Sequence, residues 1–126
     1  MRENKDYELL FAERMGYLYA HLTAPTLTNH TITDALAEAV ELCRAKKIRR
    51  LMLFRDIAEV LPDSQKFFAG VEAAEMLRGI KFALVDPNPA HTSALHFFET
   101  VIMNRGVLNK TFTSETDAEA WLLGEV

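Results

Sequence analysis

The pattern of side chains along the first part of the chain has a period of two, which predicts strands. In residues 7–14, Leu9 and Phe11 fall on one face and Leu10 and Ala12 on the other. In residues 17–23, aliphatic residues alternate with tyrosine and histidine, and Met15-Gly16 between the two segments is typical of a tight turn. Aromatic-rich runs of this period, joined by a short glycine turn, are typical of an antiparallel hairpin. We therefore predict that the chain starts with two antiparallel strands.

The period then changes, and from there helices and strands alternate. Apolar residues recur at three- and four-residue spacing in three segments that predict helices, residues 32–46, 64–78 and 92–104. One further strand is predicted after each of these helices. In chain order these strands are residues 51–54, a short apolar run, then residues 80–85 and residues 107–112. Thr31 with Asp34, and Ser114 with Asp117 before a last helix, resemble capping boxes.

The order of elements, ββαβαβαβα, predicts an α/β protein built on a five-stranded mixed sheet. After the N-terminal antiparallel hairpin come parallel βα units, because alternating strands and helices imply right-handed crossovers. The later strands are apolar on both faces, so either helices or a partner subunit must cover the second face. The 126 residues contain no linker-like break, which predicts a single domain over residues 1–126.

Composition and charge exclude several classes of protein. Apolar residues make up 49% and charged residues 25%, which is ordinary for a soluble globular protein. No apolar run approaches the ~20 residues that a transmembrane helix needs, and the polar start lacks the apolar core of a signal peptide. We expect a cytoplasmic protein. The formal charge of −4 gives no global attraction to nucleic acid, and the single Cys43 excludes an intramolecular disulfide.

The C-terminal third carries a specific structural motif. A predicted helix ends in Asn104-Arg105-Gly106, with Gly106 in the left-handed position typical of a helix end. A strand ending in Phe112 and a short helix follow, and the helix carries the motif residues Ala118, Trp121 and Leu122. With the order of elements, this motif resembles the STAS domain, in its stand-alone bacterial branch similar to the sporulation anti-sigma-factor antagonist (SpoIIAA-like).

The resemblance implies a non-enzymatic regulatory or interaction module. Antagonists of this kind bind a partner kinase, and phosphorylation of a Ser or Thr at the start of the helix after the third strand switches them off. Ser64 occupies roughly that place. The same branch is more weakly similar to lipid-carrying domains of the CRAL-TRIO type.

Ser64 therefore has two interpretations. A phosphate there would add about −1.5 to −2 charge at a helix N-terminus, where the helix dipole tolerates it. Alternatively, Asp63 or Ser64 is an N-cap, worth ~1 kcal/mol. The stretch departs from the family pattern, because a long apolar approach precedes Ser64 and the bulky Phe67 and Phe68 follow it.

Two aspartates are candidates for chemistry. Asp56 and Asp86 both follow predicted neighbouring strands, at the edge where open parallel sheets bind ligands. Two carboxylates there could hold Mg²⁺ or share a proton as an acid/base pair, although Asp is also a common turn former after a strand. No third ligand, nucleophile or phosphate loop accompanies them, so we assign no catalytic residue, no metal site and no cofactor.

The leading prediction is a partner-binding edge formed by residues 55–68 and 86–93. The apolar connection after the third strand either packs on the core or forms a contact patch. If it is mobile, it could gate a pocket for a small apolar ligand or lipid, which is the alternative function. A homodimer is a further possible assembly. The candidate edge residues are Asp56, Ile57, Val60, Leu61, Asp63, Phe67, Phe68, Asp86 and His91.

A basic run lies at the end of the first predicted helix. It is formed by Arg44, Lys46, Lys47, Arg49 and Arg50. Such a run is usually a solvated helix end that complements the helix dipole. It could instead meet an anionic lipid headgroup or an acidic partner.

Overall fold

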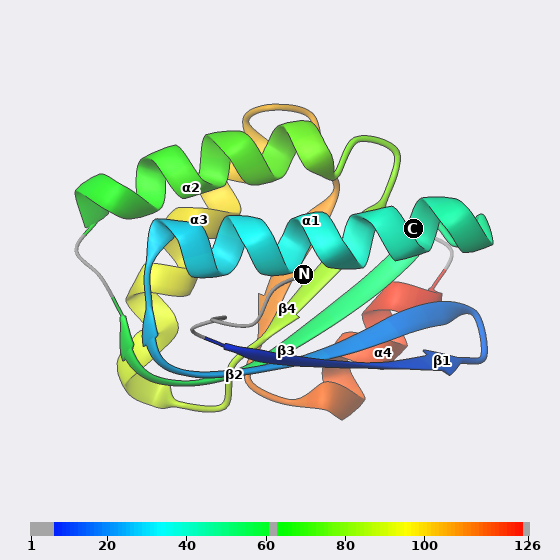
Figure 1. Cartoon of the computed structure of the whole chain (residues 1–126), viewed down its shortest axis with the longest axis horizontal. Helices are drawn as coiled ribbons and strands as arrows, with labels where there is room; N and C mark the ends of the chain where they lie inside the picture. The colour runs from blue at the N-terminus through cyan, green and yellow to red at the C-terminus, as the bar shows by residue number, and fades with distance from the viewer. Residues whose placement is uncertain (1–6, 61–62, 125–126) are drawn as a thin grey trace.

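A computed structural model describes residues 7–60 and 63–124 and confirms the predicted order of elements (Figure 1). Successive elements run from an N-terminal hairpin to a C-terminal helix. Their bounds are β1 (Glu8–Arg14), β2 (Tyr17–Leu27), α1 (Asn29–Lys46), β3 (Arg50–Val60), α2 (Asp63–Met76), β4 (Lys81–Val85), the 3₁₀ turn η1 (Pro89–His91), α3 (Thr92–Met103), β5 (Asn109–Phe112) and α4 (Glu115–Leu123).

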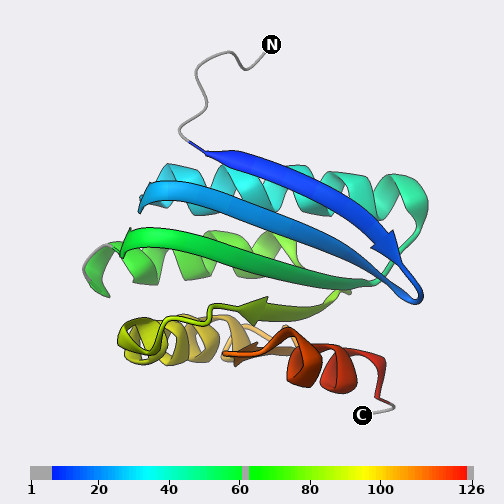
Figure 2. The same cartoon turned by 90° about the horizontal axis from the view of Figure 1, so that it is seen from below.

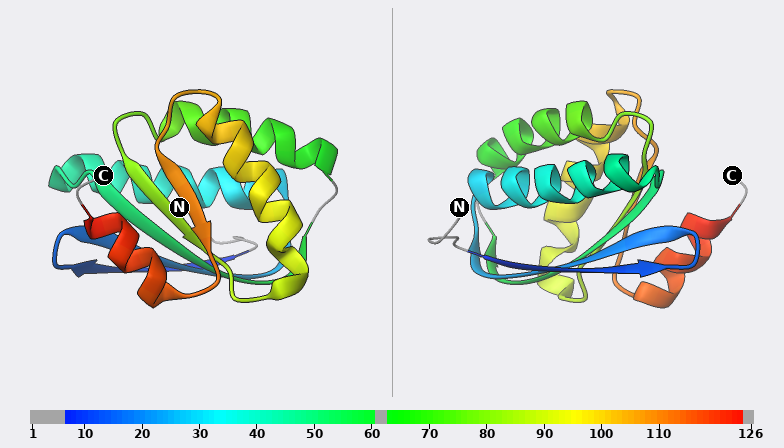
Figure 3. Two further views of the ribbon diagram at one scale, coloured as in Figure 1. Left: turned by 180° about the vertical axis from the view of Figure 1, so that it is seen from behind. Right: turned by 45° about the vertical axis from the view of Figure 1, so that its right-hand side comes forward.

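The order of the strands in the sheet is their order in the chain, β1-β2-β3-β4-β5. The β1–β2 pair is antiparallel and the other pairs are parallel, as predicted. Because every right-handed crossover steps in the same direction, α1, α2 and α3 lie on one face of the sheet (Figure 1). Helix α4 lies on the opposite face, against β3, β4 and β5 (Figures 2 and 3).

Alternation along the strands divides the apolar side chains between two cores. The larger core lies between the sheet and α1–α3, and it includes Leu18, Leu22, Leu36, Leu51, Leu53, Leu77, Phe82, Leu84 and Ile102. The smaller core lies under α4, and it consists of Tyr17, Tyr19, Met52, Ala83, Val85, Ala118 and Leu122. Helices therefore cover both faces at β3–β5. On β1, Leu10 is 60% exposed, so α4 does not cover this part of the outer strand.

Strand β3 is longer than the sequence predicted. The apolar connection after residue 54 was expected to be a loop, but β3 continues to Val60 and pairs with β2 as far as Leu27. Ile57 lies opposite Ala24 and is 5% exposed, within the larger core. The prediction that Ile57 lies in an apolar loop is therefore wrong, because Ile57 pairs with β2 and packs in the larger core.

The predicted helix ends are partly correct. Ser114 caps α4 by accepting a hydrogen bond from the Asp117 backbone N–H at 3.3 Å, and Gly106 has a φ of +86°. The capping box at Thr31 is wrong, because α1 begins one turn earlier, where Thr28 accepts from the Thr31 N–H. No helix in the described ranges is long and apolar enough to cross a membrane.

Candidate functional site

A buried cluster of charges lies where β3 and β4 approach the loop before α3. Asp86, 1% exposed, directly follows β4. Arg55 Nε of β3 donates to Asp86 Oδ2 at 2.7 Å, and His91 Nδ1 lies 2.8 Å from the same oxygen. The Asn88 backbone N–H donates to Asp86 Oδ1 at 2.9 Å. One carboxylate therefore joins two strands and the loop that follows them.

The local sequence explains how His91 returns to Asp86. Asn88 caps the 3₁₀ turn, because its Oδ1 accepts from the Ala90 N–H at 2.9 Å. Pro89 at the first position of the turn fixes the backbone without losing a needed donor. The turn reverses the chain within five residues and directs the His91 ring inward, where it is buried.

The contacts within the network shift the pKa values of Asp86 and Arg55. Burial alone would raise the pKa of Asp86, but the hydrogen bonds from Arg55, Asn88 and His91 outweigh it and hold that pKa below its usual value. Burial lowers the pKa of Arg55, and Asp86 counteracts this. Because the carboxylate is anionic, His91 Nδ1 carries a proton towards it.

The second ring nitrogen of His91 also has a neighbour in this loop. The Asn88 side-chain nitrogen lies 3.4 Å from His91 Nε2. Asp86 and Asn88 therefore contact the two nitrogens of the His91 ring.

The pair of aspartates considered for acid/base chemistry or Mg²⁺ is not formed. Successive strand residues point to opposite faces, so Arg55 is buried against Asp86 whereas Asp56 is exposed on the other side. Across the parts of the chain that the structure describes, no group of three His, Cys, Asp or Glu residues could hold a metal ion. The partner of Asp86 is Arg55, which the sequence analysis missed.

Helix α2 presents two aromatic side chains to solvent. Phe67 is 39% and Phe68 62% exposed, and their rings meet edge to face with centroids 5.5 Å apart. The Arg105 guanidinium carbon lies 5.4 Å from the Phe67 ring centroid. The sequence analysis named both phenylalanines as candidate residues of a partner-binding edge, and that role stays a prediction. Small residues take the inner face, namely Ala69, Gly70, Ala73 and Ala74.

The structure places the remaining candidates only in part. Ser64 lies in the first turn of α2, at the predicted helix start. The side chains of Ser64, Asp63 and Val60, and the whole of Leu61, lie outside the described residues. The choice between cap and phosphoacceptor at Ser64 therefore stays a prediction.

The sheet topology bears on what this edge can bind. Ligands of open α/β sheets bind where the strand order reverses and adjacent crossovers separate onto opposite faces. Here the crossovers α1, α2 and α3 all lie on one face, so no such reversal occurs. The edge that contains Asp86 is therefore not the usual crevice of a nucleotide-binding sheet.

Comparisons with known proteins identify the fold. No protein-family model matches the chain, and no curated protein matches it. The chain is similar to the crystal structure of an anti-sigma factor antagonist from Mycobacterium paratuberculosis, with a TM-score of 0.64 and 12% identity over 94% of this chain and 95% of that one. It is also similar to an uncharacterised protein of the DUF3478 family with a SpoIIAA-like fold from Shewanella loihica, with a TM-score of 0.56 and 14% identity over 97% and 98% of the two chains. The fold is thus SpoIIAA-like, as predicted.

Proposed function

We propose that this chain is a regulatory protein-interaction module without catalytic activity. It binds another protein through the edge formed by the N-terminal half of α2 and residues 86–93. The observation that carries the proposal is the exposed pair Phe67 and Phe68 on a SpoIIAA-like fold. The name of the similar mycobacterial protein, an anti-sigma factor antagonist, suggests an anti-sigma factor as the class of partner.

The surface around the two phenylalanines has the properties of an interface anchor. Aromatic and arginine side chains supply much of the binding energy of protein interfaces, and Phe67, Phe68 and Arg105 lie together here. Next to this surface, α2 packs closely on α3 at Gly70, where an added Cβ would lie 2.7 Å from Val101 Cγ1.

Phe68→Ser is the direct test of this surface. A photo-crosslinking residue at position 68 would first capture the partner in the source organism, and mass spectrometry would identify it. With the purified partner, we expect Phe68→Ser to weaken binding by about tenfold or more, because a central aromatic anchor is worth roughly 2 kcal/mol. The measurement is titration calorimetry, with circular dichroism to show that the variant folds.

Leu10→Ser is the matched control. Leu10 is 60% exposed, much like Phe68, but lies on β1. We expect this variant to bind the partner within about twofold of the parent, since a peripheral exposed residue contributes little. Unchanged binding by Phe68→Ser, or an equal loss in Leu10→Ser, would contradict the proposed surface.

Phosphorylation of Ser64 is the proposed switch of this interaction. A phosphate in the first turn of α2 would place about −1.5 to −2 charge a few residues before Phe67 and Phe68. After incubation with a partner kinase, we expect the Ser64 peptide to gain one phosphate and the protein to lose partner binding. Ser64→Ala should keep binding after the same treatment. An unmodified Ser64 peptide, with the kinase active on another substrate, would refute the switch alone.

The homodimer considered from the sequence stays a prediction.

A further inference from the structure

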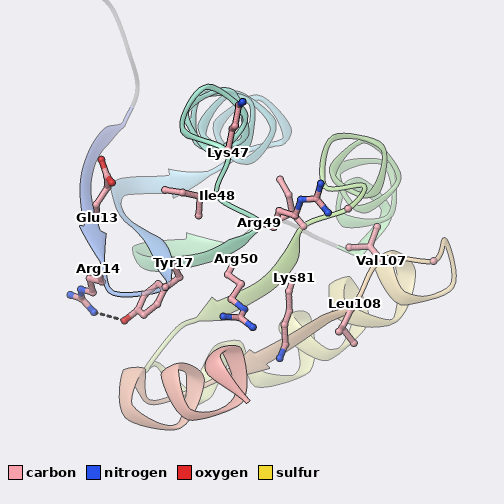
Figure 4. A pocket seen from close by; sticks show the side chains of 14 residues that line it. Glu13, Arg14, Tyr17, Lys47, Ile48, Arg49, Arg50, Lys81, Val107 and Leu108 are labelled. Atoms are coloured by element: carbon pink, nitrogen blue, oxygen red, sulfur yellow. Dashed lines mark hydrogen bonds between the residues drawn. The ribbon is translucent and has the colours of Figure 1, made fainter. Parts of the chain in front are cut away.

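A groove lies at the N-terminal ends of the parallel strands, whereas Asp86 lies at their C-terminal ends (Figure 4). Its volume is about 740 Å³, within the range of small-molecule sites. The hairpin turn at Gly16 and the loops before β3, β4 and β5 form its walls. A Cβ added at Gly79 or Gly106 would meet no atom within 4 Å, so both glycines border open space.

The groove is strongly positive in a chain whose formal charge is −4. Its five basic lining residues are Arg14, Lys47, Arg49, Arg50 and Lys81. Glu13 is the one carboxylate in the lining, and it is already paired with Lys46 at 2.6 Å. The groove therefore concentrates positive charge against the sign of the whole molecule.

Several of the nearby basic side chains have structural partners. Arg14 pairs with Glu115 at 3.2 Å. Arg44, outside this groove, donates to two carbonyl oxygens at the end of α2. Lys81 Nζ donates to the Trp121 carbonyl oxygen at 2.7 Å. Their positions are explained by the packing of the fold.

Three basic residues of the groove are not explained in this way. Within the described residues, no carboxylate pairs with Lys47, Arg49 or Arg50. Lys47 lies beyond the end of α1, with a left-handed backbone at φ +59°. A second hollow of about 410 Å³ also borders Lys47 and Arg49 and shares further lining with the first. The unpaired charges thus extend along the groove rather than gathering at one point.

Arg50 and Lys81 bring two positive charges together. They are register partners at the first positions of β3 and β4, and neighbouring strands lie ~4.8 Å apart. Their side chains point in the same direction in Figure 4. Burial, and then the charge of Arg50, lower the pKa of Lys81. An anion bound beside Arg50 would be attracted by both charges.

We propose that this groove binds a small molecule that carries two or more phosphate groups. One phosphate would lie at Arg50, beside Lys81, and another towards Arg49 and Lys47, because guanidinium groups bind phosphate oxygens in bidentate pairs. The side chains of Ile48, Val107 and Leu108 offer an apolar wall for the organic part of the ligand.

A small anion fits the charge distribution better than an extended one. A membrane or a nucleic acid meets the field of the whole chain, which is negative. A small ligand inside the groove responds mainly to the cations beside it, because exposed charges further away than about a Debye length are screened. The proposal concerns a different edge of the sheet from the partner-binding surface and does not depend on it.

Calorimetric titration with inorganic tripolyphosphate tests the groove. We expect saturable binding about tenfold or more tighter than that of orthophosphate at the same ionic strength, because the longer ion has more phosphate oxygens to contact several cations at once. Arg50→Gln should weaken it about tenfold or more, a loss of about 1.4 kcal/mol. Lys110→Gln removes an exposed positive charge on β5 and should change it less than about twofold.

Three outcomes would overturn the proposal. They are no saturable binding of tripolyphosphate, an equal loss in Lys110→Gln, and Arg50-dependent sedimentation with phosphatidylglycerol vesicles in the absence of tripolyphosphate binding, which would assign the groove to a lipid headgroup. Circular dichroism of Arg50→Gln shows that a loss is not unfolding. Phe68→Ser should keep tripolyphosphate binding and Arg50→Gln should keep partner binding, so the two proposals fail separately.

Discussion

Asp86→Asn is expected to lower the free energy of unfolding by about 3–5 kcal/mol, which is the cost of leaving a buried charge without its partner. Arg55 stays protonated in proteins, and here it lies buried with its Nε 2.7 Å from Asp86 Oδ2. An asparagine keeps the shape of the side chain but removes the negative charge. Urea denaturation followed by circular dichroism measures the change.

Asp56→Asn is the matched control for this substitution. It makes the same chemical change on the same sheet, at an exposed side chain. We expect an effect within about 0.5 kcal/mol, as for other surface substitutions. Equal losses in the two variants would show that the charge of Asp86 is not what holds this edge together.

A double variant separates the ion pair from the packing around it. Replacing both partners, as Arg55→Met with Asp86→Leu, removes the unpaired charge that either single change leaves behind. We expect the double variant to be more stable than Asp86→Asn, because apolar replacements of buried ion pairs are often neutral. His91 would lose the acceptor of its Nδ1 proton, so full recovery is not expected.

The same network gives a pH dependence with a definite sign. The pKa of Asp86 in the folded chain lies below its ordinary value of 3.8. Its contribution to stability is therefore present above about pH 4 and is lost as the pH falls through the folded pKa. Asp86→Asn should lack this part of the acid dependence, which denaturation curves between about pH 5 and pH 2 would show.

Gly70→Ala is expected to lower the free energy of unfolding by about 1–3 kcal/mol, as is typical of overpacking. A Cβ at Gly70 would lie 2.7 Å from Val101 Cγ1 and 3.0 Å from Val101 Cβ, so α2 and α3 would have to move apart. Alanine is the better helix former by ~1 kcal/mol. Since that gain acts in the opposite direction, any net loss reports the close contact of the two helices.

Val101→Ala provides the background that tests this explanation. It removes both γ-carbons, including the one that a Cβ at position 70 would meet. In this background we expect Gly70→Ala to destabilise less than in the parent chain, because the 2.7 Å contact with Cγ1 is removed while the 3.0 Å contact with Cβ remains. A Gly70→Ala variant that is already more stable in the parent chain would contradict the close approach.

The order of elements could be predicted because its signals are local. The change of period from two to that of a helix and the glycine turn at Gly16 both lie within a few residues of the elements that they define. The end of β3 could not be predicted in the same way. Arg55 and Asp56 look like the end of a buried strand, and Arg55 is buried only because Asp86, distant in the sequence, pairs with it.

The candidate site was predicted less completely because its parts meet only in the folded chain. Asp86 and His91 were named, but the spacing of residues gives no sign that they would bond each other. The inner face of α2 depends on how closely α3 approaches at Gly70, which a helical period does not specify. The basic run was visible in the sequence. The groove was not, because four separate loops build it.

The strand order of the sheet also bears on how the chain folds. Each strand pairs with the strand that immediately precedes it in the sequence, from β2 on β1 to β5 on β4. During synthesis, the hydrogen-bonding edge that a new strand needs has therefore always been made already. Loop closure never spans more than one helix and its turns, which keeps its entropic cost small. After β1, no strand has to wait for a partner from further along the chain before it can pair, which limits the exposure of unpaired edges that aggregate.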